Sequence, residues 1–162
     1  MATILVIEDE KDIRENIVET LEISGFDALG ASNGYQGIDL VRQISPDCVI
    51  CDIMMDGLDG FGVLEMLRSE SGTHDLPFIF VTALTDANTL QQAHEMGANA
   101  YLTKPFASDD LLDAVAMQLQ YRKPPPASGD RMFAAARNRV LEQAAARVGR
   151  RGQVAHVVRD VL

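Results

Sequence analysis

The sequence predicts an α/β protein with a doubly wound, five-stranded parallel sheet. Short apolar segments alternate with helical patterns five times within residues 4–121, which is typical of this class. The strongest apolar segments are continuous rather than alternating, as expected for strands that are buried on both faces of a parallel sheet. Sheets of this kind bind ligands beyond the carboxyl ends of their strands. Functional residues are therefore expected directly after the strands.

Each strand and each helix is predicted from its own segment. The predicted strands are residues 4–7, 26–29, 48–51, 78–81 and 100–102. The predicted helices place apolar residues three or four positions apart, and they are residues 11–23, 34–44, 60–68, 86–96 and 108–121. Ser108 precedes Asp109 and Asp110, a good helix start because a hydroxyl caps the first turn and acidic residues favour it.

The composition changes after residue 123, and this change sets the predicted domain boundaries. Residues 1–123 are predicted to form the folded domain, and residues 124–130, which include three successive prolines, are predicted to be a linker. Residues 131–162 are predicted to be a helical extension or the start of a truncated effector or connector. Within them, residues 131–148 carry an apolar helical stripe, a glycine-flanked break follows, and residues 154–162 suit the start of another helix.

The net charge of −10 is unevenly distributed along the chain. Residues 1–123 contain 7 Lys and Arg against 21 Asp and Glu, whereas residues 124–162 contain 7 Arg against 3 acidic residues. A strongly acidic body repels nucleic-acid phosphates, so no direct contact with nucleic acid is expected. The sequence shows neither a membrane-spanning apolar segment nor the pattern of a signal peptide. We therefore expect no membrane partner and a cytoplasmic protein.

Cys48 and Cys51 have the C-x-x-C spacing that can indicate a metal or redox site. No second pair and no neighbouring histidine accompany them. On a strand, their side chains would point to opposite faces of the sheet. Small buried hydrophobic residues are therefore the better interpretation.

Polar residues follow four of the predicted strands directly. Glu8, Asp9 and Glu10 follow the first, Asp52 the third, Thr82 the fourth, and Thr103 and Lys104 the fifth. If the strands are parallel, these residues gather at one edge of the sheet, where carboxylates would repel one another unless a cation joined them. Carboxylate oxygens suit a hard ion such as Mg²⁺. A lysine and a hydroxyl beside that ion are what a phosphoryl group in transfer needs.

Five motifs together resemble the receiver domain of two-component response regulators, over about residues 2–122. They occur in family order, and they are Ile7-Glu8-Asp9-Glu10, Asp52-Ile53-Met54-Met55, Asp59-Gly60, Val81-Thr82-Ala83, and the segment 97–106 that ends in Thr103-Lys104-Pro105-Phe106. The resemblance implies the flavodoxin-like receiver fold. No single motif is as specific as this joint pattern.

The resemblance also implies a role for each matching residue. Asp52 would be the phosphoryl acceptor, and Lys104 and Thr82 would contact the phosphoryl group. The implied Mg²⁺ ligands are Glu8, Asp9, Asp52 and the backbone carbonyl of Met54. Thr82 and Tyr101 would move on activation, and the peptide bond between Lys104 and Pro105 is usually cis in the family.

One position departs from the family pattern. Members commonly have proline four residues after the acceptor, where this chain has Asp56. The substitution adds a negative charge and removes a backbone restraint. An altered Mg²⁺ affinity or loop mobility is therefore expected.

The function implied by the resemblance is a phosphorylation-dependent signalling switch of a two-component system. A sensor histidine kinase or a phosphotransfer protein would donate to Asp52, and the new conformation would change contacts with a downstream protein effector. Self-phosphorylation and autodephosphorylation are the only chemistry expected, so the chain is not expected to be an enzyme. A homodimer through residues 86–121 or through the helix at 131–148 is a further hypothesis.

Three alternatives stay open at this point. The domain could be the receiver module of a larger multidomain regulator or kinase whose effector is truncated here. A magnesium-dependent phosphatase of the haloacid dehalogenase type also uses an Asp nucleophile, but that family needs a second Asp where Met54 stands. Finally, residues 155–162 faintly resemble the histidine box of sensor kinases, with His156 at the phosphorylatable position but without the usual acidic residue and proline.

Overall fold

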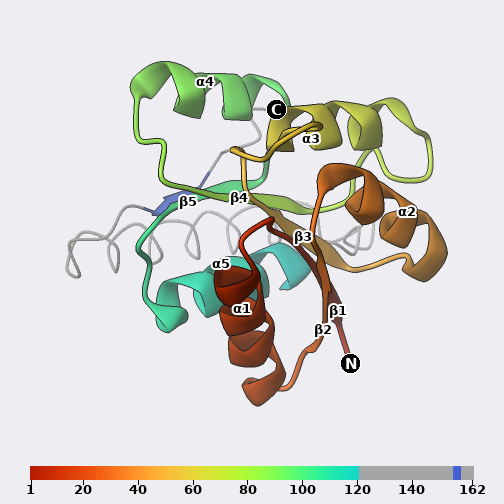
Figure 1. The fold of residues 1–162 in the computed structure, drawn as a ribbon, viewed down its shortest axis with the longest axis vertical. Coiled ribbons are helices and arrows are strands. Elements are labelled where there is room, and N and C mark those ends of the chain that lie inside the picture. The colour runs from red at the N-terminus through yellow and green to blue at the C-terminus, as the bar shows by residue number, and fades with distance from the viewer. Residues whose placement is uncertain (121–154, 158–162) are drawn as a thin grey trace, which may run out of the picture.

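The computed structural model describes residues 1–120 and 155–157, which form a six-stranded sheet with helices on its two faces (Figure 1). The strand order is β2-β1-β3-β4-β5-β6. The first five strands pair in parallel, as predicted. They are β1 (Thr3–Ile7), β2 (Asp27–Ala31), β3 (Cys48–Cys51), β4 (Phe78–Thr82) and β5 (Ala100–Thr103).

Among the described residues, four helices connect these five strands and a fifth follows β5, and each predicted helix is confirmed to within a residue or two of its ends. They are α1 (Lys11–Ile23), α2 (Gly34–Ile44), α3 (Gly60–Ser69), α4 (Ala87–Glu95) and α5 (Ser108–Gln120). Side-chain caps begin several of them. Asn33 accepts a hydrogen bond from the Gln36 amide, and Asp86 accepts one from the Thr89 amide, so two of the amides that a helix start leaves unpaired find partners.

Two apolar cores lie on opposite faces of the sheet, each beneath one of the two helix layers seen in Figure 1. Helices α2, α3 and α4 cover one face through residues such as Ile38, Leu64 and Ala93. Helices α1 and α5 cover the other through residues such as Leu21 and Leu111. Strands β1, β3 and β4 contribute alternate residues to both cores, which explains why their sequences are apolar without a break.

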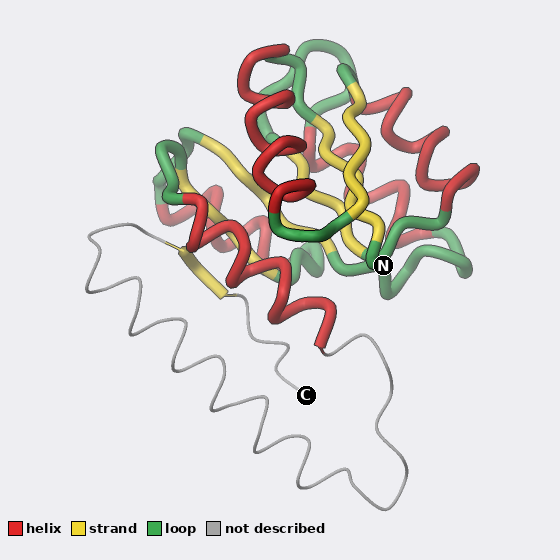
Figure 2. Tube along the Cα trace, turned by 90° about the horizontal axis from the view of Figure 1, so that it is seen from below, coloured by secondary structure: helices red, strands yellow, loops and turns green. Residues whose placement is uncertain are grey.

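The sixth strand, β6 (Ala155–Val157), differs from the sequence-based expectation of helix over this part of the C-terminal extension. Its backbone pairs antiparallel with β5, with His156 opposite Tyr101, and it runs beside α5 (Figure 2). Strand β5 would otherwise present an open row of backbone donors and acceptors, and a segment rich in valine suits pairing at such an edge. The predicted linker at 124–130 and the predicted helix at 131–148 lie outside the described residues.

The strand order indicates which edge of the sheet can hold a ligand. The chain runs outward from β1 to β2 and then crosses back to β3 on the other side, so the direction of winding reverses between β1 and β3. A crevice forms outside the carboxyl ends of the strands at such a reversal. The backbone amide of Asp52 donates to the carbonyl of Ile7 over 3.0 Å, which joins the two strand ends at this place. In the part of the chain that the structure covers, no helix is long and apolar enough to cross a bilayer.

Candidate functional site

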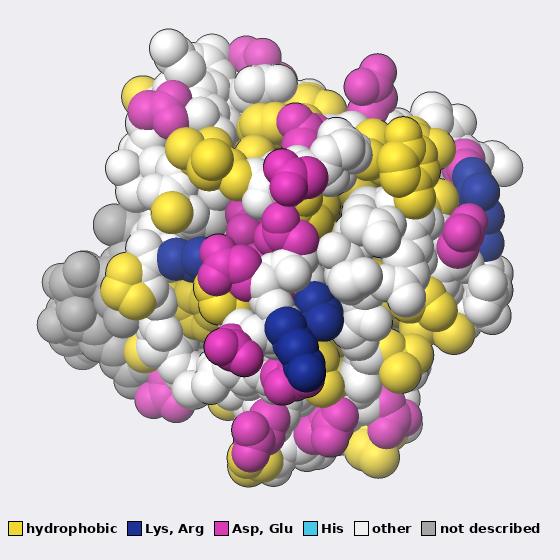
Figure 3. Space-filling view, viewed as in Figure 1, with side chains coloured by type: hydrophobic (Ala, Val, Ile, Leu, Met, Phe, Trp, Pro, Cys, Tyr) yellow, Lys and Arg dark blue, Asp and Glu magenta, His cyan; other side chains and the backbone are white. Residues whose placement is uncertain are grey.

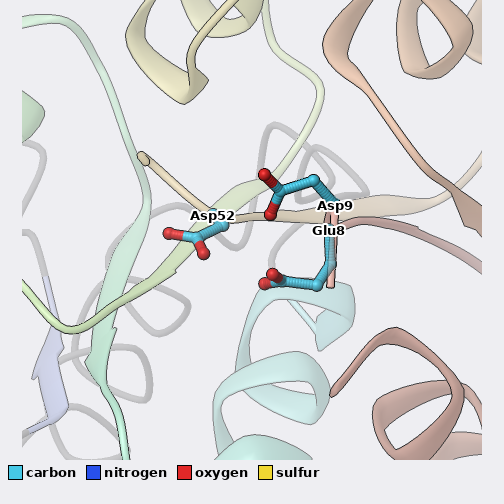
Figure 4. A group of neighbouring side chains, drawn as sticks. All are labelled: Glu8, Asp9 and Asp52. Atoms are coloured by element: carbon cyan, nitrogen blue, oxygen red, sulfur yellow. The ribbon is translucent and has the colours of Figure 1, made fainter. Parts of the chain in front are cut away.

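Three carboxylates meet where β1 and β3 end (Figure 4). Glu8 and Asp9 follow β1, and Asp52 follows β3. One carboxylate oxygen from each of the three residues lies within 4.8 Å of those of the other two. Glu8 and Asp52 are buried, whereas Asp9 is exposed. Sequence reasoning predicted this cluster, and the structure brings all three residues together.

Lys104 joins two of these carboxylates. Its ammonium nitrogen lies 2.7 Å from Asp52 Oδ2 and 2.9 Å from Glu8 Oε2. The residue follows β5, and its peptide bond to Pro105 is cis. The other oxygen of Asp52, Oδ1, accepts a hydrogen bond from the Met54 amide over 3.1 Å. The Asp52 carboxylate is therefore held from two sides.

Burial changes the protonation of this cluster. Burial is the main reason why the pKa of Glu8 rises from 4.5 to about 7, and the charge of Asp52 raises it further against the opposing hydrogen bond from Lys104. Burial alone would lower the pKa of Lys104, but its hydrogen bonds to Asp52 and Glu8 prevail and raise it. Lys104 therefore stays charged at neutral pH, whereas the Glu8 carboxyl titrates near that pH.

The shifted pKa of Glu8 predicts how stability depends on pH when no divalent cation is present. Because folded Glu8 keeps its proton up to about pH 7 and unfolded Glu8 releases it near 4.5, the folded state binds more protons between these values. The free energy of unfolding should therefore fall as pH rises from 4.5 to 7, by on the order of 2 kcal/mol. Glu8→Gln should remove this decline in urea unfolding at a series of pH values.

The matched control for that series is Glu19→Gln, at an exposed position of α1. Its stability should follow the wild type at every pH. If Glu8→Gln also ran parallel to the wild type across pH 4.5–7, the assignment of the titration to Glu8 would be wrong.

Asp52, at the start of the loop after β3, lies directly against the start of α3. Asp59 caps this helix by accepting the Gly62 amide at 2.8 Å, and the Gly60 amide donates to the Ile53 carbonyl at 2.9 Å. A side chain at position 60 would lie 2.4 Å from the backbone oxygen of Asp52. The helix start therefore packs directly against the backbone of the acceptor candidate. The sequence identified the Asp59-Gly60 pair only as a motif.

Thr82 and Tyr101 occupy the neighbouring strands. Thr82 ends β4 and is fully buried, and its hydroxyl accepts a hydrogen bond from the Leu84 amide over 3.3 Å. Tyr101 in β5 is buried, and its hydroxyl donates to the Leu84 carbonyl. Burial raises the pKa of Tyr101 to about 12, so this hydroxyl remains a donor. Leu84, in the loop after β4, thus forms hydrogen bonds with both predicted switch residues.

An open hollow of about 430 Å³ lies beside the carboxylates. Its lining combines acidic and apolar side chains, and on the face seen in Figure 3 acidic side chains gather in the centre beside apolar ones. The lining residues are Asp9, Ile53, Met54, Met55, Asp56, Asp59, Phe61 and Leu84. Met54 is 59% exposed, and Asp56, at the usual proline position, is exposed as well.

The donor set fits Mg²⁺. Three carboxylates around a shared space offer hard oxygen ligands, and this ion is usually bound by one or two carboxylates together with water and phosphate oxygens. The burial that keeps Glu8 protonated would be opposed by a bound cation, because a nearby positive charge favours the ionised form.

Both cysteines are buried core residues, as the sequence predicts. Cys48 packs in the core under α1 and α5, and Cys51 packs in the opposite core. Both thiols are buried and neither forms a disulfide. Burial raises the pKa of the Cys51 thiol, so the thiol stays protonated and unreactive at neutral pH.

Comparison with known proteins identifies a family match over most of the described chain. Residues 4–116 match the family model of the response regulator receiver domain. The solved structure of the receiver domain of the Francisella response regulator 1452 superimposes with a TM-score of 0.72 at 30% identity. That match covers 76% of this chain and 100% of the Francisella chain.

Curated relatives show the same match in sequence. The probable transcriptional regulator ycf27 of Porphyridium aerugineum is 40% identical over 67% of this chain and 44% of its own length. The DNA-binding dual master transcriptional regulator RpaA of Synechocystis is 36% identical over 74% of this chain and 50% of its own. The chain thus spans about half the length of the curated relatives it matches.

Proposed function

The chain belongs to the response regulator receiver domain family, and on this premise we propose that Asp52 accepts a phosphoryl group in a two-component signalling switch. The family is one of signalling proteins rather than of enzymes that turn over a substrate. The observation that carries the proposal is the position of Lys104, whose ammonium group contacts both Asp52 and Glu8 beside the exposed carboxylate of Asp9.

The geometry of Asp52 supports the proposed transfer step. The donor is a phosphohistidine of a sensor histidine kinase or of a phosphotransfer protein. An oxygen of the Asp52 carboxylate attacks phosphorus, the P–N bond breaks, and its electron pair stays on the imidazole. The Met54 amide and Lys104 hold the carboxylate in place before attack, which lowers the cost of orienting it.

Glu8, Asp9, Asp52 and the Met54 carbonyl would hold Mg²⁺ at this position. When bound, the ion supplies positive charge to the phosphoryl oxygens. Lys104 supplies a second positive charge there, and the Thr82 hydroxyl is available as a hydrogen-bond donor. The same residues support self-phosphorylation from a small phosphodonor and the later hydrolysis of the acyl phosphate.

Phosphorylation would then be transmitted through the loop after β4. Drawing the Thr82 hydroxyl toward the phosphoryl group would break its bond with the Leu84 amide. The Leu84 carbonyl is the acceptor of Tyr101, so the two switch residues change together. Such contacts bias an equilibrium between two conformations and change the surface formed by α4, β5 and α5.

The output is proposed to be contact with a downstream protein effector, in the cytoplasm. The expectation of no nucleic-acid contact lacks support, because RpaA, a relative, is described as DNA-binding. The matched region in this chain is the receiver domain, so such binding would belong to the rest of a longer regulator. A phosphatase is not proposed, since Met54 stands where that mechanism needs a second carboxylate.

Intact-mass measurement after incubation with acetyl phosphate and Mg²⁺ tests the proposal. The wild type should gain one phosphoryl group, and Asp52→Asn should gain none. Asp75→Asn, in an exposed loop before β4, is the matched control and should behave like the wild type. Full incorporation into Asp52→Asn would refute the assignment.

The residues beside the site predict a long-lived phosphoryl group. Met54 and Leu84 line the hollow, and neither side chain can orient a hydrolytic water by a hydrogen bond. The half-life should therefore be on the order of minutes or longer, and Met54→Asn, which supplies an amide, should shorten it by roughly tenfold. The decay of the phosphorylated mass with time measures both values. A wild-type half-life of seconds would contradict the prediction.

A further inference from the structure

Arg14, in the first turn of α1, reaches back over the turn that carries Glu8 and Asp9. Its Nη1 donates to the backbone carbonyl of Glu8 over 2.8 Å. The side chain is half-buried, and its guanidinium group touches no carboxylate in the described structure. Arg14 therefore acts on the backbone of this turn rather than on a side chain.

Gly30, in the edge strand β2, provides the surface on which the Arg14 side chain lies. A Cβ atom at position 30 would meet both Cγ and Cδ of Arg14 at 3.0 Å and Nε at 3.5 Å. Glycine weakens a strand interior, and its presence often marks the close approach of another group. Here that group is the aliphatic stem of Arg14.

The same β2 segment holds the other side of the Glu8 peptide. The Glu8 amide donates to the Ala31 carbonyl over 3.0 Å, while Arg14 holds the Glu8 carbonyl. Both backbone groups of Glu8 are thus fixed, one by β2 directly and one by an arginine that packs on β2. These two bonds hold the backbone from which the side chains of Glu8 and of the adjacent Asp9 extend.

We propose that Arg14, seated on Gly30, is a positioning residue that fixes the Glu8–Asp9 turn for binding of a divalent cation. The inference rests on the proposed function only in taking this carboxylate cluster as the cation site. Arg14 would preorganise two ligands through the backbone, and groups that orient metal ligands commonly change metal affinity when removed.

A double-mutant cycle with Mg²⁺ titration of the unphosphorylated full chain tests the proposal. The readout is the Mg²⁺ dissociation constant from backbone amide chemical shifts, with the free energy of unfolding measured separately without cation. Arg14→Ala should weaken Mg²⁺ binding by about tenfold. Gly30→Ala should weaken it too, because the new methyl group displaces the Arg14 stem.

The effects of Arg14→Ala and Gly30→Ala on the Mg²⁺ dissociation constant should not multiply in the double variant. In the Arg14→Ala background, Gly30→Ala should leave the dissociation constant unchanged, since the side chain that its methyl group would displace is already absent. Arg14→Lys, which keeps a cationic donor, should recover part of the affinity. Arg42→Ala, which removes an exposed arginine paired with Glu70 elsewhere, should bind Mg²⁺ like the wild type.

Two results would overturn the proposal: an unchanged dissociation constant in Arg14→Ala, or losses that multiply in the double variant. If Arg14→Ala fails to fold, Arg14→Lys and Gly30→Ala decide, and wild-type affinity in both would refute it. Failure of the proposed function would look different. Wild-type protein would then bind Mg²⁺, with Arg14 affecting it, but acquire no phosphoryl group on Asp52.

Discussion

Gly60→Ala should destabilise the protein by more than about 3 kcal/mol, because the added methyl group clashes with backbone that cannot move aside. Its Cβ would lie 2.4 Å from the carbonyl oxygen of Asp52 and 2.7 Å from Cα of Ile53. Relief requires α3 or the loop after β3 to shift. A shift of that loop moves the Asp52 carboxylate away from Lys104, so phosphoryl incorporation should fall together with stability.

Gly72→Ala is the matched control for this substitution. Nothing lies within 4 Å of a Cβ at position 72, and its φ lies outside the left-handed region. The control should be neutral or slightly stabilising in urea unfolding, since alanine restricts the unfolded chain. Equal stability of Gly60→Ala and Gly72→Ala would contradict the close packing of α3 against the Asp52 backbone.

Lys104→Ala should slow phosphoryl incorporation by roughly a hundredfold or more, the loss expected when one preorganised charged donor is removed from a transfer site. Lys104 is the cation that contacts both Asp52 and Glu8. Without it, the Asp52 carboxylate and the charge on the phosphoryl oxygens both lose a positively charged partner. The rate of mass gain with acetyl phosphate at saturating Mg²⁺ measures the effect.

Lys11→Ala controls for the loss of a lysine as such. Lys11 is an exposed residue that pairs with Glu15 one turn along α1, and exposed pairs of this kind contribute little to stability. Its variant should incorporate phosphoryl groups at the wild-type rate. A wild-type rate in Lys104→Ala would remove Lys104 from the proposed chemistry.

Most of the fold follows from local patterns in the sequence. Continuous apolar segments such as the one at 78–81 predicted buried parallel strands, and stripes such as the one at 108–121 predicted the helices beside them. The order of the strands then brought Glu8, Asp52 and Lys104 to one edge, as expected. These predictions succeeded because the period of apolar residues reports directly on which faces are buried.

Contacts between segments that are far apart in the chain could not be predicted from the sequence. The packing of Arg14 on Gly30 depends on how α1 crosses β2. Arg68 likewise donates to the carbonyls of Leu76 and Gly97 and to Asn99, which ties α3 to two loops. A long polar residue on a helix leaves the same pattern in the sequence whether its side chain is solvated or bonds to a distant carbonyl. The strand at 155–157 was missed for a related reason, since its pairing depends on the open edge of β5.

Reductive trapping locates the phosphoryl group and so tests the central proposal most directly. An aspartyl phosphate is an acyl phosphate, and borohydride reduces its carbonyl carbon to an alcohol with release of phosphate, which converts the aspartate to homoserine. Protein treated with acetyl phosphate and Mg²⁺, then reduced and digested, should yield a peptide with homoserine at position 52 and aspartate at positions 9 and 56. Homoserine at another acidic position, or phosphate retained on His156 with Asp52 unmodified, would contradict the account.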